Sequence, residues 1–277
     1  MGFYQDRQGI LHVEEFGEWP WLVHGFSTRR AGNLGLSAGN SRAQLWQNQQ
    51  LFLSRLGAGG MRLVTLRQIH SAIVRVVGAA TPSGQPGDTL LTAAAGLLAG
   101  VKTADCLPVL LVDVRRRVVG AVHTGWRGAA KRAVEKAVGD MRCSFGCRPS
   151  DLHAAIGPGI QACCFEVGAE VLEEFASQFV DAEEFCRRDP VNPALIRLPR
   201  QVLTNPRPLL RPLHVEPGRV DLAELVRRQL LAGGVPAPHI YNSGLCTVCH
   251  PEKFFSHRRE KEAAGRMLSV IGARAER

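Results

Sequence analysis

The chain has 277 residues, of which 45% are hydrophobic and 21% charged, and its formal net charge is +9. A chain of this size and composition can bury enough apolar surface to fold without disulfides. No run reaches the roughly 18 apolar residues of a membrane helix, and the N-terminus lacks a secretion-signal pattern. We therefore expect a cytoplasmic protein with no membrane partner.

The predicted elements alternate irregularly along the chain. Apolar periodicity predicts helices, and short apolar runs predict strands. Strands outnumber strand-helix-strand alternations, which favours an α+β fold, and no linker divides the chain, so we expect one domain over residues 1–277. A Pro-rich stretch, 189–217, is expected to be a long surface connection. In chain order the elements are helix 42–56, strands 63–68, 73–77, 107–113 and 118–123, helix 128–141, strand 152–156, helices 170–178 and 222–232, strand 239–241 and helix 260–271.

Most of the positive charge comes from arginine, which supplies 29 of the 34 basic residues. The arginines are scattered, with several pairs and one triplet at 115–117. Proteins that bind single-stranded nucleic acid interleave basic and aromatic residues, and no basic stretch here does so. We expect a solvated basic surface and no nucleic-acid partner. Salt-sensitive retention of DNA would test the alternative.

A tight hairpin is predicted where the apolar runs 107–113 and 118–123 flank Arg115 and Arg116. Antiparallel pairing about this turn puts residue 106 opposite about residue 125. Cys106 and His123 should therefore emerge together at the open end of the hairpin.

His70 follows strand 63–68 and could complete a group of two histidines and one cysteine with Cys106 and His123. Three such ligands with an open fourth position are typical of catalytic zinc. The glycine-flanked helix start after His123 could also bind an anion such as phosphate. Each residue alone has an ordinary alternative, since cysteines pack as small hydrophobes and histidines form hydrogen bonds.

Other cysteines give a weaker signal. Cys246-x-x-Cys249-His250 matches the attachment pattern of c-type haem. Without an export signal or a second Cys-x-x-Cys pair, we interpret it as structural. Cys163 and Cys164 are expected to pack in a loop.

Ordered motifs along nearly the whole chain identify it as similar to the YfiH-type family, also described as laccase-domain or multicopper polyphenol oxidase proteins. The motifs are His24-Gly25-Phe26-Ser27-Thr28-Arg29, Gln68-x-His70, Thr103-Ala104-Asp105-Cys106, His123-Thr124-Gly125-Trp126-Arg127-Gly128, Ile156-Gly157-Pro158-Gly159-Ile160, Cys246-Thr247-x-Cys249 and Phe254-Phe255-Ser256-x-Arg258-Arg259.

The resemblance implies a mixed α/β/β/α fold, similar to cysteine-hydrolase toxin domains, and zinc bound by His70, Cys106 and His123. It also implies a purine nucleoside enzyme that phosphorolyses adenosine, inosine or methylthioadenosine and deaminates adenosine. Its partners would be nucleosides and phosphate, and the protein a monomer or homodimer.

Two departures from the family pattern concern phosphate. Ala31 replaces a glycine, and Gln49 replaces an arginine that the family carries at the start of the helix before Gln-x-His. We therefore expect weak phosphorolysis, unless Arg30 or Arg55 supplies the missing charge. Our phosphate candidates are Arg29 and Arg127, because arginine binds phosphate in a bidentate way. Asp105 could orient a ligand, act in acid–base chemistry or simply stabilise its loop.

Two further enzyme classes stay open. A metal-free Cys106–His123 hydrolase could act on amide bonds of peptidoglycan precursors, with which a bacterial member of the family is linked. Copper could also enter a site with two histidines and one cysteine and support polyphenol oxidation. However, no two of the nine histidines stand two positions apart, so the His-x-His pairs of a four-copper laccase are missing.

Overall fold

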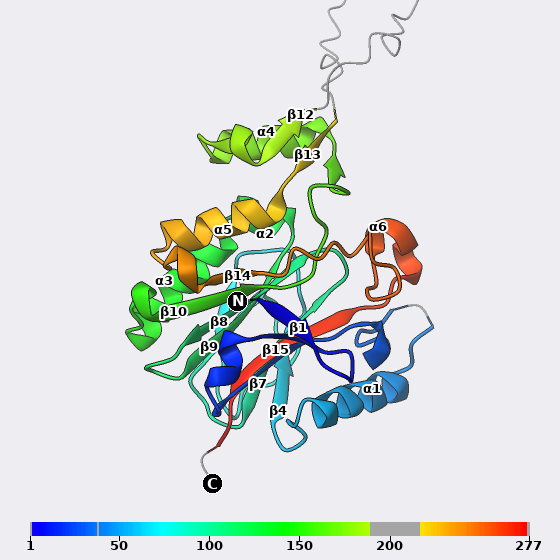
Figure 1. Cartoon of the computed structure of the whole chain (residues 1–277), viewed down its shortest axis with the longest axis vertical. Coiled ribbons are helices and arrows are strands. Elements are labelled where there is room, and N and C mark those ends of the chain that lie inside the picture. The colour runs from blue at the N-terminus through cyan, green and yellow to red at the C-terminus, as the bar shows by residue number, and fades with distance from the viewer. Residues whose placement is uncertain (1, 38, 189–216, 276–277) are drawn as a thin grey trace, which may run out of the picture.

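The computed structural model describes residues 2–37, 39–188 and 217–275. Two six-stranded sheets pack face to face, and helices cover both outer faces, so the layers run α/β/β/α (Figure 1). The predicted α+β fold with this layering is confirmed. The predicted connection at 189–217 lies almost entirely outside the described residues.

The first sheet has the order β1-β2-β3-β15-β7-β4. β15 pairs antiparallel with β3 and β7 in its centre, and β4 lies parallel to β7 at its edge. Phe52 and Leu53 of helix α1 (Arg42–Arg55) pack on its outer face. The strands are β1 (Phe3–Gln5), β2 (Leu11–Val13), β3 (Leu22–Phe26), β4 (Arg62–Thr65), β7 (Leu97–Thr103) and β15 (Met267–Ala273).

The helix predicted at 260–271 is wrong. Only α6 (His257–Glu260) and a 3-10 turn (Lys261–Ala263) are helical, and β15 follows them. All seven residues of β15 are buried, because the strand has a neighbour on each side and core on each face. Such a strand has a continuous apolar sequence, which periodicity alone cannot distinguish from a buried helix.

The second sheet has the order β14-β10-β8-β9-β6-β5. β8 pairs antiparallel with both β9 and β10, and β14 runs parallel to β10. The strands are β5 (Val74–Val76), β6 (Thr89–Thr92), β8 (Leu107–Asp113), β9 (Val118–Thr124), β10 (Leu152–Ile156) and β14 (Ile240–Asn242).

Three helices cover the outer face of this sheet: α2 (Trp126–Ala130), α3 (Ala133–Phe145) and α5 (Leu222–Ala232). The helix predicted at 128–141 is therefore two helices. Arg132 separates them with φ of 56°, a left-handed conformation that a continuous α-helix cannot contain.

A small third sheet, in the order β11-β13-β12, lies with α4 (Ala169–Gln178) beyond the covering helices (Figure 1). Its strands are β11 (Glu166–Val167), β12 (Cys186–Arg188) and β13 (Gly218–Val220). Among the described residues, no helix is both long and apolar enough to span a membrane. The remaining helical turns in the described parts of the chain are the 3-10 segments Glu15–Glu18, Arg29–Ala31, Pro149–Asp151, Ala182–Glu184 and Ala237–His239.

The central core fills the space between the two large sheets. Phe26, Val64 and Ile271 of the first sheet meet Leu110 and Ala121 of the second in one buried apolar cluster. The described chain crosses between these sheets in the segments 66–73, 93–96, 104–106 and 243–266. The crossings 66–73 and 104–106 carry residues of the predicted metal site.

Candidate metal centre

The hairpin has the predicted register. Asp113 pairs with Val118 beside the turn, and Leu107 pairs with Thr124 at the open end. Cys106, directly before β8, is therefore opposite Gly125, as the sequence predicts. His123 is the next-to-last residue of β9 and is buried.

His70 reaches the same end from the crossing segment 66–73. The metal-binding atoms of His70, Cys106 and His123 all lie within 4.8 Å of one another. The two imidazole rings stand edge to face, with their centres 5.0 Å apart. The predicted trio is therefore a real cluster in space, drawn from two sheet crossings and one strand end.

A carboxylate that the sequence analysis missed organises this cluster. Asp88, directly before β6, is fully buried and accepts a hydrogen bond of 2.8 Å from Nδ1 of His123. It also accepts hydrogen bonds from the backbone N–H groups of His70, at 3.0 Å, and Ser71, at 2.7 Å, and from the Ser71 hydroxyl. One side chain thus fixes both histidines. No motif surrounds Asp88, so only its contacts identify it.

These contacts hold the Asp88 side chain ionised. Burial alone would raise its pKa, but the hydrogen bonds from His123 and Ser71 outweigh burial and hold the pKa well below its usual value. An ionised carboxylate only accepts, so Nδ1 of His123 carries the proton and Nε2 is the ring nitrogen available to a metal. Asp88 also holds the backbone of His70, whose φ of 55° is left-handed and unfavourable for a residue with a Cβ.

The charges within the trio support each other. Burial opposes ionisation of Cys106, yet His123 and His70 lower the pKa of the thiol to about 6. Burial likewise opposes protonation of His123, yet Cys106 and Asp88 raise its pKa to about 9. A thiolate beside imidazoles is the donor set of zinc sites with three protein ligands.

Gly125 leaves room at the centre of the trio. A Cβ at this position would lie 2.8 Å from Sγ of Cys106 and 3.4 Å from Cδ2 of His70. The backbone of Gly125 is extended, with φ of −89°, so any residue could adopt it. Glycine is therefore required here by space rather than by conformation, and the donor set and the space together fit a metal ion.

The trio opens into a cavity of about 600 Å³ whose lining holds both apolar and basic side chains. Apolar side chains suit a flat ring, and basic side chains suit an anion. Asp105 is the one acidic residue among the described residues of the lining. The apolar residues are Leu36, Leu66, Trp126, Ile160, Phe165 and Leu222, and the basic ones are Arg67, Lys102, His257, Arg258, Lys261 and Arg266.

Asp105 has a structural role in the turn before Cys106. Its carboxylate accepts hydrogen bonds from the Thr247 hydroxyl, at 2.7 Å, and from the backbone N–H of Arg258, at 2.6 Å. Its backbone has φ of 89°, so these contacts stabilise an unfavourable conformation. Of the roles expected for Asp105, stabilising its loop agrees with these contacts, whereas Asp88 is the carboxylate that contacts His123.

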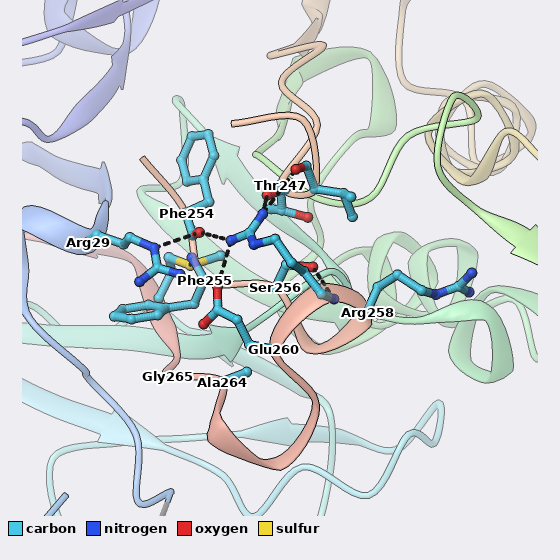
Figure 2. A network of polar contacts seen from close by, with 12 residues as sticks. Arg29, Thr247, Phe254, Phe255, Ser256, Arg258, Glu260, Ala264 and Gly265 are labelled. Carbon is cyan, nitrogen blue, oxygen red and sulfur yellow. Dashed lines mark hydrogen bonds and ion pairs between the residues drawn. The ribbon is translucent and has the colours of Figure 1, made fainter. Parts of the chain in front are cut away.

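Arg29 and Arg127 are not among the described residues that line the cavity. Arg29 donates from Nε to the carbonyl of Phe254, forms an ion pair with Glu260 and stacks over the ring of Phe255 (Figure 2). It therefore ties the N-terminal motif to the C-terminal one. Arg127 is exposed and stacks over Trp126, with its guanidinium carbon 4.4 Å from the ring centre.

The positions that the sequence analysis connected with weakened phosphate binding also lie away from the cavity. Gln49 stands in the middle of α1, not at its start, because Ser41 caps this helix by accepting from the N–H of Gln44. Arg55 donates to the backbone carbonyl of Arg30. None of Gln49, Arg30 and Arg55 is among the described lining residues. Of the basic residues of the cavity, Arg258 lies in a family motif, but none of them was a candidate for phosphate in the sequence analysis.

Comparisons with known proteins identify the family of the chain. A family model described as multi-copper polyphenol oxidoreductase laccase matches residues 23–274. The chain is 34% identical to the purine nucleoside phosphorylase YlmD of Geobacillus stearothermophilus, over 99% of this chain and 98% of that protein. It is 31% identical to the adenosine deaminase RL5 of an unknown prokaryotic organism, over 95% of each chain.

Among solved structures, the hypothetical protein YfiH of Bacillus licheniformis is similar with a TM-score of 0.83 and 26% identity, covering 98% of this chain and 99% of that one. The fold, the ordered motifs and the extent of these matches lead to one assignment. The chain belongs to the family described as multi-copper polyphenol oxidoreductase laccase.

Proposed function

We propose that this chain is a zinc-dependent purine nucleoside enzyme that phosphorolyses adenosine, inosine or methylthioadenosine and deaminates adenosine. The observation that carries the proposal is the trio of His70, Cys106 and His123, oriented by Asp88, at the wall of a cavity that is part apolar and part basic. Relatives of comparable length carry the names of both activities.

His70, Cys106 and His123 would hold the metal. Zinc bound there would supply a Lewis acid that makes a water or a nucleoside hydroxyl more acidic. Asp88 would keep His123 in the tautomer that leaves Nε2 free, and Gly125 would keep space open beside the sulfur. The protein would thus provide a fixed donor set before the substrate enters.

The apolar side chains of the lining suit a purine base, because Trp126 and Phe165 offer flat surfaces and Leu66 and Ile160 exclude water. In deamination, water adds at C6 of adenine and ammonia leaves. In phosphorolysis, an oxygen of phosphate forms a bond with ribose C1′ while the bond from C1′ to N9 breaks. The products are the free base and ribose 1-phosphate, or 5-methylthioribose 1-phosphate where methylthioadenosine is the substrate.

The basic side chains of the lining suit phosphate, and Lys102 is the strongest candidate ligand among them. Burial lowers the pKa of Lys102, and within the described part of the chain its ammonium group has no hydrogen-bond or ion-pair partner. By contrast, Arg258 donates to the carbonyl of Glu166, and Arg266 donates to the carbonyls of residues 264 and 265. A half-buried cation without a partner gains most from binding an anion.

The test is an assay of adenosine, inosine and methylthioadenosine, with and without phosphate, on protein whose zinc content is measured. We expect base release that requires phosphate, ammonia release from adenosine that does not, and loss of both with the zinc in Cys106→Ala. Full activity of metal-stripped protein would contradict the proposal.

A second candidate, a thiol hydrolase, is favoured by the charge pairing of Cys106 with His123, since a thiolate beside an imidazolium is a nucleophile. Metal-stripped protein that cleaves amide bonds of peptidoglycan precursors would support it. A four-copper oxidase has less support. Among the described residues, the His/Cys/Asp/Glu groups able to hold a metal are the trio and one cluster of cysteines, and neither offers the histidine pairs of a trinuclear site.

A further inference from the structure

Four cysteines from two distant segments converge outside the metal centre. The sequence shows Cys163 and Cys164 as one pair and Cys246 and Cys249 as another, 82 positions further along. In the structure the sulfur atoms of all four lie within 4.8 Å of one another. The second pair that a tetrathiolate site requires is therefore present, although it does not have Cys-x-x-Cys spacing.

The sheet topology explains the convergence. β10 and β14 are parallel neighbours, so the loops that follow them begin at the same end of the two strands. The two loops then stay paired, because the N–H of Gly159 donates to the carbonyl of Leu245 and the N–H of Thr247 donates to the carbonyl of Gly159. Cys246 lies within this contact, and Cys163, Cys164 and Cys249 follow it by a few residues, so the paired loops hold the four cysteines together.

The spacing of the sulfur atoms matches a single metal ion. Sγ of Cys249 lies 3.6 Å from that of Cys163 and 3.4 Å from that of Cys164. Tetrahedral zinc with bonds of about 2.3 Å places its sulfur ligands about 3.8 Å apart. All four cysteines are free thiols, so none is consumed by a disulfide.

From this geometry we propose that Cys163, Cys164, Cys246 and Cys249 form a second metal site, a closed tetrathiolate zinc site with a structural role. Four protein ligands leave no open position, unlike the trio of the catalytic centre. The site does not depend on the function proposed above, because it shares no residue with the trio.

Backbone donors surround the sulfur of Cys246. The side chain is buried, and the backbone N–H groups of Gln161, Val248 and Cys249 form hydrogen bonds with the sulfur. Hydrogen bonds to a ligand atom fix its orientation in metal sites.

The proposed site would stabilise the turn that carries Cys106 of the trio. Thr247, next to Cys246, donates to the carboxylate of Asp105, and the N–H of Ile160, on the other loop, donates to the Asp105 carbonyl at 2.7 Å. Asp105 precedes the zinc ligand Cys106 in a strained turn. A metal that joins the two loops would thus hold this turn from both sides.

The zinc content of variants that also lack the thiol of Cys106 tests the proposal. Protein reconstituted with zinc under reducing conditions should hold about two zinc ions per chain, and Cys106→Ala about one. Adding Cys163→Ser and Cys249→Ser to Cys106→Ala should remove the remaining zinc. Cys143→Ser, which changes an exposed cysteine outside the cluster, should remove none and serves as the matched control. A folded Cys106→Ala protein that holds no zinc would overturn the proposal, whatever the enzyme assays show.

A measurement on the unaltered chain keeps the test valid if the serine variants do not fold. Alkylation followed by mass spectrometry should find the four cysteines protected in zinc-loaded protein and reactive after chelation, whereas Cys143 should react in both. Cobalt in place of zinc in Cys106→Ala should give the intense charge-transfer absorption of four thiolates. Equal reactivity with and without zinc, or a disulfide between the two pairs, would refute the site.

Discussion

Replacing Asp88 by asparagine should weaken zinc binding at the trio without changing any ligand. The carboxylate accepts from His123 and from the backbone of His70 and Ser71. Asparagine keeps one acceptor oxygen, but its NH₂ group replaces the other oxygen. That NH₂ group is a donor, and it would face the N–H donors that the carboxylate now accepts from. Loss of a hydrogen-bonded partner of a metal-binding histidine lowers metal affinity about 10- to 100-fold, or about 1.4–2.7 kcal/mol. Each buried donor left unpaired should also reduce the free energy of unfolding by about 1–3 kcal/mol.

The assay is competition for zinc against a coloured chelator, on protein whose folding is checked by circular dichroism. Asp113→Asn is the matched control. Asp113 is equally buried and accepts from the backbone N–H groups of Arg115 and Arg116, but it lies at the opposite end of the hairpin. We expect Asp113→Asn to cost stability and leave zinc affinity within about twofold of the original. Equal zinc affinity in Asp88→Asn and the original protein would refute the argument, as would an equal loss in both variants.

Four further results are expected. Cys106→Ala should lose the catalytic zinc and both nucleoside activities together, and activity that survives the loss of metal would favour the thiol hydrolase. Gly125→Ala should lower zinc affinity, because the new Cβ would lie 2.8 Å from the sulfur of Cys106; unchanged affinity in a chelator titration would show that the trio can shift. Lys102→Met should raise the phosphate KM by about 10- to 100-fold, the loss of one charge-assisted hydrogen bond, at constant zinc content, whereas the exposed Lys131→Met should have no effect. Burial, with the charge of His12, lowers the pKa of His24 to about 3, so between pH 7 and pH 5 the unfolded chain binds a proton at His24 and the folded chain does not. When the pH falls from 7 to 5, the free energy of unfolding measured in urea titrations should therefore decrease by about 2 kcal/mol less in His24→Gln than in the original protein. Identical pH profiles of the two proteins would show that His24 is not responsible.

Local patterns predicted the parts of the molecule that depend on neighbours in the sequence. The hairpin register followed from the apolar runs and their turn, and it correctly brought Cys106 to the level of Gly125. The family motifs predicted the layered fold. The helix predicted at 260–271 failed because burial on both faces removes the alternation that identifies a strand.

The missed site residues depend on contacts that no local pattern records. Asp88 precedes an ordinary buried strand, and only the sheet packing brings it to His123. Cys163 and Cys164 likewise gain meaning only from the loop that carries Cys246, which parallel pairing of β10 with β14 places beside them. The assignment of Arg29 to phosphate did not anticipate its ion pair with Glu260. That residues 1–277 form one domain stays a prediction.

Two of the three trio residues lie where the chain crosses from one large sheet to the other. Cys106 and His123 can meet as soon as the hairpin closes, because only 17 positions separate them. His70 comes from the crossing that leaves β4 of the first sheet, and Asp88, directly before β6 of the second sheet, holds its backbone N–H. A metal held by all three residues would therefore link this crossing to the hairpin, and its binding energy would add to the free energy of unfolding. Loss of the metal would then lower the stability of the folded protein as well as stop the proposed chemistry.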